Sequence, residues 1–155
     1  MGNLFYRTPS ENPEGKGDRN CVTPLIFSFF SGAGFLDLGF EKAGFEIGYV
    51  NEVHKPFLDA YKYSRQRIGT PQPLHGYFEG DIECCLTGKE AKHLSSLVNA
   101  AKSDKQLVGF IGGPPCPDFS VGGKNRGQHG ENGKLSKIYV DLICKQQPDF
   151  FVFEN

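Results

Sequence analysis

The sequence predicts an α/β protein with a parallel sheet in a doubly wound arrangement, covered by helices on both faces. Short, nearly continuous apolar runs alternate along the chain with segments whose apolar residues recur at helical spacing. Strands that are apolar along their whole length are typical of parallel sheets buried on both sides. In such folds the carboxyl ends of the strands share one edge, and ligands bind there.

Length and composition limit the kinds of protein that this chain can be. It has 155 residues, 38% of them hydrophobic, which suits one soluble domain with a core. A formal net charge of −1 gives no general basic surface, so nucleic-acid binding would depend on a local patch. With no apolar run of membrane-spanning length and no signal peptide, we expect a cytoplasmic protein, nucleoid-associated if bacterial. The five cysteines form no CxxC pair, which argues against a disulfide framework and a metal site.

The N-terminal part contains a polar segment, a strand, a turn and a helix. Residues 1–22 are rich in Gly, Pro, Asn and charge, and we expect a flexible lead-in there. The apolar, aromatic run 25–30 predicts a buried strand that ends in the glycine turn 31–34. Apolar residues at helical spacing follow over 35–43, with Gly44 as a stop.

The remaining elements continue the alternation of strands and helices. Further strands are expected at 45–50, 75–78, 107–111 and 150–153, and helices at 54–65, 89–101 and 135–143. A long loop is expected between 112 and 133. Chemistry-bearing residues directly follow the predicted strands, namely Phe30 to Gly34, Glu52, Asp81, Cys116 and Glu154. We therefore expect these residues to gather along one edge of the sheet.

Cys116 is the first candidate for chemistry. It follows Gly112-Gly113-Pro114-Pro115, at the end of a predicted strand. The prolines fix φ and remove backbone donors, and the glycines allow a ligand to approach closely. A thiol mounted in this way suits a nucleophile. The alternative is a small buried residue in a proline-rich loop, which free cysteine often is.

Four other positions are weaker candidates by themselves. Ser31-Gly32-Ala33-Gly34 is similar to a ligand-binding strand–helix turn, although a tight turn without ligand also fits. Glu52 follows a strand where an acid can hold ribose hydroxyls, or it is a solvated loop carboxylate. Asp81 could accept a hydrogen bond from an amine, or it could only stabilise a turn. Glu154 ends an apolar strand, so we expect partial desolvation that favours its protonated form and lets it donate a proton.

Together these segments resemble the DNA cytosine-5 methyltransferases, in the family's order and near its spacing. The matching segments are Phe30-Ser31-Gly32-Ala33-Gly34, Asn51-Glu52, Gly80-Asp81-Ile82, Gly113-Pro114-Pro115-Cys116 with Phe119-Ser120, and Glu154-Asn155. The Pro-Cys and Glu-Asn elements are the specific ones. The resemblance covers 25–155, so we expect 23–155 to be a partial catalytic domain without the family's target-recognition region.

The resemblance implies an incomplete Rossmann-like fold that binds S-adenosylmethionine. The residues that it assigns to the cofactor are Phe30, Ser31, Gly32, Ala33, Gly34, Glu52, Asp81, Ile82, Pro115 and Leu135. By the same likeness Cys116 is the nucleophile that adds to carbon 6 of a flipped cytosine. Glu154 stabilises the ring at N3 while carbon 5 takes the methyl group.

The resemblance also implies double-stranded DNA as the partner, within restriction-modification. Flipping the target base costs roughly a few kcal/mol. Five glycines after Cys116 would let the loop close over DNA, and Ser120, Lys124 and Arg126 are the nucleic-acid-binding candidates. An ordinary solvated loop is the alternative.

The chain departs from the family pattern in ways that limit what it does alone. Ser28 stands where the family usually has an acid in the strand, Phe35 where it has a glycine, and Val53 where an aromatic residue often packs on adenine. The later family motifs are absent, so we expect the isolated chain to be weakly active or inactive, with a second chain as one source of those motifs.

Three other functions remain open. They are a tRNA cytosine-5 methyltransferase of the same family, a catalytically inactive cofactor-binding remnant, and a thiol hydrolase. The hydrolase would need a histidine base, and only His129 is close to Cys116 in sequence.

Overall fold

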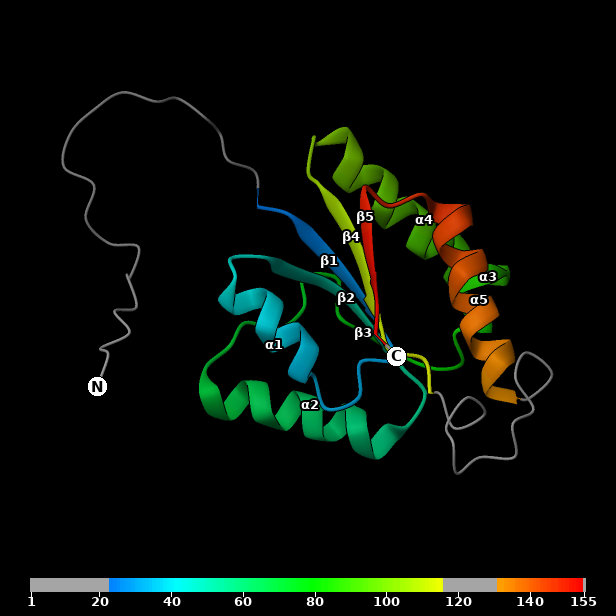
Figure 1. Cartoon of the computed structure of the whole chain (residues 1–155). Helices are drawn as coiled ribbons and strands as arrows, with labels where there is room; N and C mark the ends of the chain where they lie inside the picture. Colours follow the sequence, from blue (N-terminus) through cyan, green and yellow to red (C-terminus); the bar gives the residue numbers. More distant parts are fainter. Residues whose placement is uncertain (1–22, 116–130, 155) are drawn as a thin grey trace, which may run out of the picture.

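The computed structural model describes residues 23–115 and 131–154, which form five strands and five helices. The strands are β1 Leu25–Phe29, β2 Glu46–Glu52, β3 Tyr77–Glu79, β4 Val108–Gly112 and β5 Phe150–Phe153. They pair in parallel throughout, in the order β3-β2-β1-β4-β5 (Figure 1). The parallel α/β fold predicted from the sequence is confirmed. The chain reverses its direction of travel across the sheet between β1 and β4, which makes this the topological switch point.

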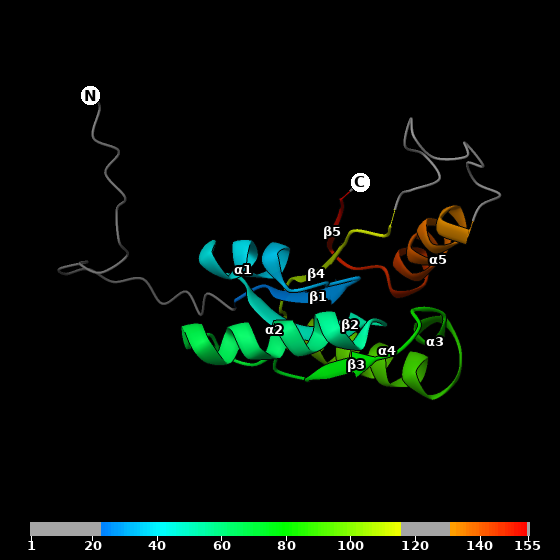
Figure 2. The same cartoon turned by 90° about the horizontal axis from the view of Figure 1, so that it is seen from below.

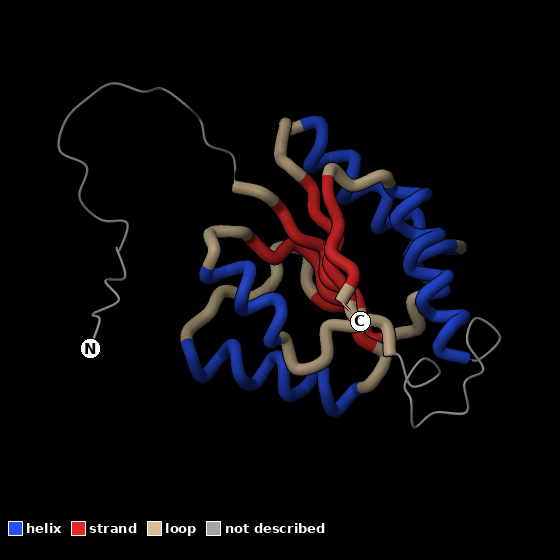
Figure 3. The backbone as a smooth tube through the Cα atoms, viewed as in Figure 1, coloured by secondary structure: helices blue, strands red, loops and turns tan. Residues whose placement is uncertain are grey.

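Helices cover both faces of the sheet. They are α1 Phe35–Lys42, α2 Lys55–Ile68, α3 Glu83–Leu86, α4 Gly88–Ser103 and α5 Glu131–Gln146. The helices α1 and α2 lie on one face and α3, α4 and α5 on the other, as Figure 3 shows most plainly and Figure 2 shows from below. The sheet is therefore the middle of three layers.

The strand β1 shows why this sequence forms a central strand. All five of its residues are buried, and successive side chains point to opposite faces of the sheet. Phe27 and Phe29 pack in the core beneath α4 and α5, whereas Ile26 packs in the core beneath α1 and α2. A strand buried on both faces needs apolar residues on both, and the run 25–29 supplies them with one exception, Ser28.

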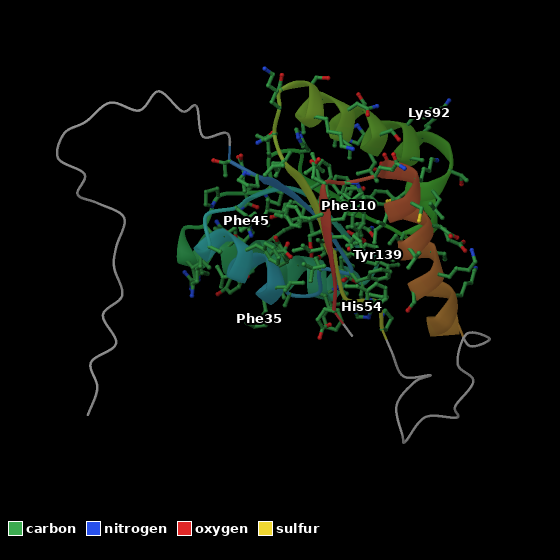
Figure 4. The ribbon with its side chains drawn as sticks, turned by 45° about the horizontal axis from the view of Figure 1, so that its top comes forward. Phe35, Phe45, His54, Lys92, Phe110 and Tyr139 are labelled. Carbon is green, nitrogen blue, oxygen red and sulfur yellow. The ribbon has the colours of Figure 1, made fainter. Side chains whose placement is uncertain are left out.

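An aromatic cluster fills the core beneath α5. The rings of Phe29 and Phe110 have centroids 5.0 Å apart, and those of Phe29 and Tyr139 are 5.8 Å apart. Figure 4 shows Tyr139 extending from α5 toward the sheet and Phe110 within it. The Tyr139 hydroxyl donates to the carbonyl of Val152 on β5 at 3.2 Å, and burial raises the pKa of Tyr139. This packing fixes α5 against β1, β4 and β5.

The predicted elements are all present, with shifts at their ends. The strand β2 continues to Glu52, two residues past the predicted end, because Asn51 and Glu52 are polar but buried and hydrogen-bonded. The helix α2 runs to Ile68 and ends at Gly69, and α5 begins at Glu131, inside the predicted loop. The short helix α3 was not predicted. Within the described residues, no helix is long and apolar enough to cross a membrane.

Candidate functional site

A pocket of about 380 Å³ lies at the carboxyl edge of the sheet, across the switch point between β1 and β4. Loops that follow β1, β2, β3 and β4 all contribute to it. Its lining residues are Phe30, Gly32, Asn51, Glu52, Val53, His54, Phe57, Gly80, Asp81, Ile82, Gly113, Pro115 and Leu135. Its volume and its place in the fold are those of a small-molecule site.

Phe30 forms one wall of the pocket and has an unusual backbone. Its φ is +52°, a left-handed conformation that is a genuine outlier for a bulky residue. Its ring packs edge-on against Tyr139, with centroids 6.0 Å apart. Strained residues of this kind cost about 1–3 kcal/mol and cluster at ligand sites. The conformation turns the chain sharply after β1 and brings Gly32 to the pocket.

Glu52 connects two loops of the pocket through its carboxylate. It is 7% exposed, and its Oε2 accepts from the Gly32 N–H at 2.9 Å while its Oε1 accepts from the His54 N–H at 2.7 Å. The solvated loop carboxylate considered from the sequence is therefore wrong. Each carboxylate oxygen has about two acceptor positions, so both can accept a further bond from a ligand hydroxyl.

The loop after β3 is held in place by Asn51. Its Nδ2 donates to the carbonyls of Gly80 at 2.8 Å and Phe78 at 3.3 Å. Asp81 is exposed on this loop, and its Oδ1 accepts from the Glu83 N–H at 2.8 Å at the start of α3. Ile82, only 3% exposed, completes this side of the pocket. Asp81 thus has a structural partner and still lines the pocket.

Two further lining residues, His54 and Phe57, were missed as site residues, whereas Val53 was expected beside the adenine. Val53 is 63% exposed and Phe57 52%, and the rings of His54 and Phe57 have centroids 4.7 Å apart. Figure 4 shows His54 near the carboxyl ends of the strands. One feature of the sequence could have indicated these residues. The helix α2 starts three residues after Glu52, so its first turn must lie at the same edge of the sheet.

Three predicted cofactor residues, Ser31, Ala33 and Gly34, do not line this pocket. Ala33 and Gly34 instead line a second pocket, of about 350 Å³, that is formed by α1 and α2. Gly34 lies away from the first pocket because its φ of +87° turns the chain into α1. The Ser31 hydroxyl is buried and has no hydrogen-bond partner within the described part of the chain. Such a group costs about 1–3 kcal/mol, so it points to a polar partner that the described atoms do not include.

Glu154 lies beside the loop that leads to Cys116. Its N–H donates to the Gly112 carbonyl at 2.9 Å, and a Cβ built on Gly113 would lie 2.6 Å from Glu154 Oε2. Glu154 is exposed in the described part of the chain, so the prediction that its apolar strand desolvates it is wrong. The strand β5 is an edge strand of the described sheet, and this explains the exposure.

Four predicted site residues lie outside the described residues. They are Cys116, Ser120, Lys124 and Arg126. The predicted lead-in, 1–22, and Asn155 also lie outside them. Pro115, which directly precedes Cys116, is described and lines the pocket together with Leu135 of α5.

Comparisons with known proteins identify the family. A type II methyltransferase of Neisseria meningitidis, M.NmeDI, is 68% identical over 131 residues, which are 84% of this chain and 31% of that protein. M.NgoPII of Neisseria gonorrhoeae is 36% identical over 84% of this chain and 32% of its own length, so this chain spans about a third of these relatives.

The fold has a solved counterpart. A structure described as a DNA modification methyltransferase encoded within an E. coli prophage matches with a TM-score of 0.56 and 23% identity, over 83% of this chain and 31% of that chain. At this identity the match supports the fold alone. The family model for C-5 cytosine-specific DNA methylase matches residues 25–155. The resemblance seen in the sequence is confirmed, and the chain belongs to the C-5 cytosine-specific DNA methylase family.

Proposed function

We propose that this chain is the cofactor-binding and nucleophile-bearing part of a DNA cytosine-5 methyltransferase of a restriction-modification system. The observation that carries the proposal is the convergence of Phe30, Glu52, Asp81 and Pro115 on one pocket at the switch point. The type II methyltransferases among its relatives support the reaction and the restriction-modification setting.

The residues of the pocket fit S-adenosylmethionine. Glu52 has free acceptor positions for the ribose hydroxyls, and Asp81 offers a carboxylate to the adenine amine. Ile82, Phe30 and Leu135 supply apolar walls. When bound, the cofactor supplies an electrophilic methyl group on a positively charged sulfur.

Cys116 and Glu154 would carry out the chemistry on the base. The Cys116 thiolate adds to carbon 6 of cytosine and forms a C–S bond, and the ring's electrons shift toward carbon 5. Glu154 holds the ring at N3 and donates a proton there as that charge develops. Carbon 5 would then take the methyl group from the cofactor's sulfur, so that S-adenosylhomocysteine leaves and the N3 proton returns to Glu154. Loss of the carbon 5 proton to water and elimination of the Cys116 thiolate would restore the double bond between carbons 5 and 6.

DNA is the proposed substrate, as a duplex from which one cytosine is flipped. Ser120, Lys124 and Arg126 are proposed to contact the nucleic acid, with the basic side chains on phosphates. A second chain that carries the family's later motifs is part of the proposal as a partner.

Two measurements on the purified chain test the proposal. Calorimetric titration with S-adenosylhomocysteine should show binding that Glu52→Ala abolishes. Duplex DNA with 5-fluorocytosine at the target position, incubated with S-adenosylmethionine, should give at most a low yield of denaturation-resistant adduct, and Cys116→Ser should give none. Adding the C-terminal part of M.NmeDI as a separate chain should raise the yield of adduct.

The outcomes separate the alternatives. A folded chain that does not bind S-adenosylhomocysteine refutes the proposal. An adduct with fluorinated tRNA but not with duplex DNA assigns the chain to the tRNA branch. Cofactor binding without an adduct on either substrate, even with the added C-terminal part, identifies a cofactor-binding remnant.

A further inference from the structure

A buried hydrogen-bonded cluster lies beneath the glycine turn, outside the pocket. The Ser28 hydroxyl of β1 donates to Asp37 Oδ1 at 2.7 Å, and the Tyr61 hydroxyl of α2 donates to Asp37 Oδ2 at 2.6 Å. Asp37 itself belongs to the first turn of α1 and is 0% exposed. One carboxylate thus joins the end of β1, the start of α1 and the middle of α2.

Arg65 extends the cluster and adds one positive charge to it. Its Nη1 donates to the Tyr61 hydroxyl at 3.0 Å, and its guanidinium forms an ion pair with Glu41 of α1. The Arg65 side chain is 5% exposed. Burial raises the pKa of Asp37, and its two hydroxyl donors oppose that rise. Buried polar clusters in which every member has a partner make the local structure rigid.

The cluster touches the glycine turn through the ring of Tyr61. A Cβ built on Gly34 would lie 2.4 Å from Tyr61 Cε2, so the ring lies directly against the Gly34 backbone. Gly34 also closes the turn, since its N–H donates to the Ser31 carbonyl at 3.0 Å. The position of the Tyr61 ring therefore limits where the turn can lie.

We propose that Asp37 is a positioning residue of the cofactor site. Its carboxylate holds the Tyr61 ring under Gly34 and ties Ser28 to α1, and these contacts fix residues 30–34 in the shape that places Phe30 and Gly32 at the pocket. The link between Asp37 and the cofactor rests on the proposed function, but the effect of Asp37 on the turn does not.

The same cluster accounts for Ser28 in a strand that otherwise contains only apolar residues. Ser28 donates to the carboxylate of Asp37, nine residues later in the chain, so its buried hydroxyl has a partner. Ser28→Asp would bring two buried carboxylates into contact, which is strongly unfavourable.

The test compares two buried tyrosines that each donate to a carboxylate. Tyr61→Phe keeps the ring but removes the bond to Asp37. Tyr49→Phe is the matched control, because Tyr49 is 2% exposed, lies in the other core and donates to Glu90 Oε1 at 2.7 Å. Asp37→Asn is the second test variant. Each is measured without cofactor by amide hydrogen exchange of 31–38 and by urea unfolding, and then by S-adenosylhomocysteine titration.

We expect Tyr61→Phe and Asp37→Asn to speed exchange in 31–38 and to weaken cofactor binding by about tenfold, which corresponds to about 1.4 kcal/mol. Tyr49→Phe should lower global stability with neither effect. Equal rates of amide exchange in 31–38 in all three variants, after correction for global stability, would overturn the inference. Faster exchange in the two test variants, in a chain that never binds S-adenosylhomocysteine, would support the positioning of the turn and refute the proposed function instead.

Discussion

The carboxylate of Glu154 lies against the backbone of Gly113, with Oε2 only 2.6 Å from where a Cβ of residue 113 would be. The two residues follow neighbouring strands, since β4 and β5 pair in parallel and the Glu154 N–H donates to the Gly112 carbonyl. The absence of a side chain at 113 therefore leaves room for the carboxylate next to the loop that leads to Cys116.

Gly113→Ala should displace the Glu154 carboxylate without unfolding the protein. The contact is with the end of an exposed, flexible side chain, so we expect a loss of stability below about 1 kcal/mol. The rate of adduct formation with 5-fluorocytosine DNA should fall by roughly tenfold to a hundredfold, the cost of a small misplacement at a reacting centre.

The matched control for Gly113 is Gly39. It lies on the outer side of α1, where an added Cβ meets no atom within 4 Å. Gly39→Ala should raise the free energy of unfolding by about 0.5–1 kcal/mol and leave the adduct rate unchanged. An unchanged adduct rate in Gly113→Ala would show that the position of Glu154 does not matter to the chemistry.

Glu52→Gln should lower both stability and cofactor affinity. Gln has one acceptor oxygen, so its NH₂ group must face the N–H of either Gly32 or His54. We expect the free energy of unfolding to fall by about 1–3 kcal/mol, as for a buried donor left unpaired. Urea unfolding and S-adenosylhomocysteine titration measure the two effects. Glu46→Gln, exposed at the other end of β2, should change neither.

Asp81 combines two roles that substitutions can separate. Its Oδ1 accepts from the Glu83 N–H at 2.8 Å, and the amide oxygen of asparagine can accept the same hydrogen bond. Asp81→Asn should therefore keep the thermal midpoint of the parent while weakening S-adenosylhomocysteine binding, because the amide lacks the carboxylate's charge. Asp81→Ala should lower both. If Asp81→Asn binds as the parent does, the carboxylate has no role in cofactor recognition.

The sheet could be predicted because its strands are apolar on both faces. Each apolar run can be recognised from its own residues, without knowledge of the rest of the chain. The sequence also predicted that Glu52 and Asp81 would lie at one edge, since that follows from parallel strands alone. The burial of Glu52 could not be predicted, because its donors come from two loops that meet only through the register of β1 and β2.

Gly34 and Asp37 show a second limit of sequence reasoning. The glycine turn was expected to face the cofactor along its whole length, but the direction of each residue depends on the positive φ of Phe30 and Gly34. Asp37 was not singled out, since its partners Ser28 and Tyr61 lie 9 and 24 residues away. Tertiary packing, and not local pattern, determines both.

The adjacent cysteines Cys84 and Cys85 should differ in reactivity. Cys84 is exposed, whereas Cys85 is buried with its sulfur 3.7 Å from the Tyr49 hydroxyl. Burial raises the pKa of the Cys85 thiol from 9.0 to about 12, so little thiolate is present in the folded chain at pH 8. Iodoacetamide should label Cys84 and spare Cys85 until urea is added. Equal labelling of both cysteines in the native protein would contradict the buried position.

The raised pKa of the Cys85 thiol also predicts how the free energy of unfolding changes at alkaline pH. The folded chain favours the neutral Cys85 thiol, so this contribution is complete below the unfolded pKa of 9.0 and is lost as the pH rises toward about 12. Cys85→Ser removes the titration and keeps the shape of the side chain, with a slightly smaller atom in place of the sulfur. Urea unfolding from pH 8 to 11 should show a shallower decline in Cys85→Ser than in the parent, even though the buried tyrosines titrate in both. Parallel declines would mean that the Cys85 thiol ionises as readily in the folded chain as in the unfolded one.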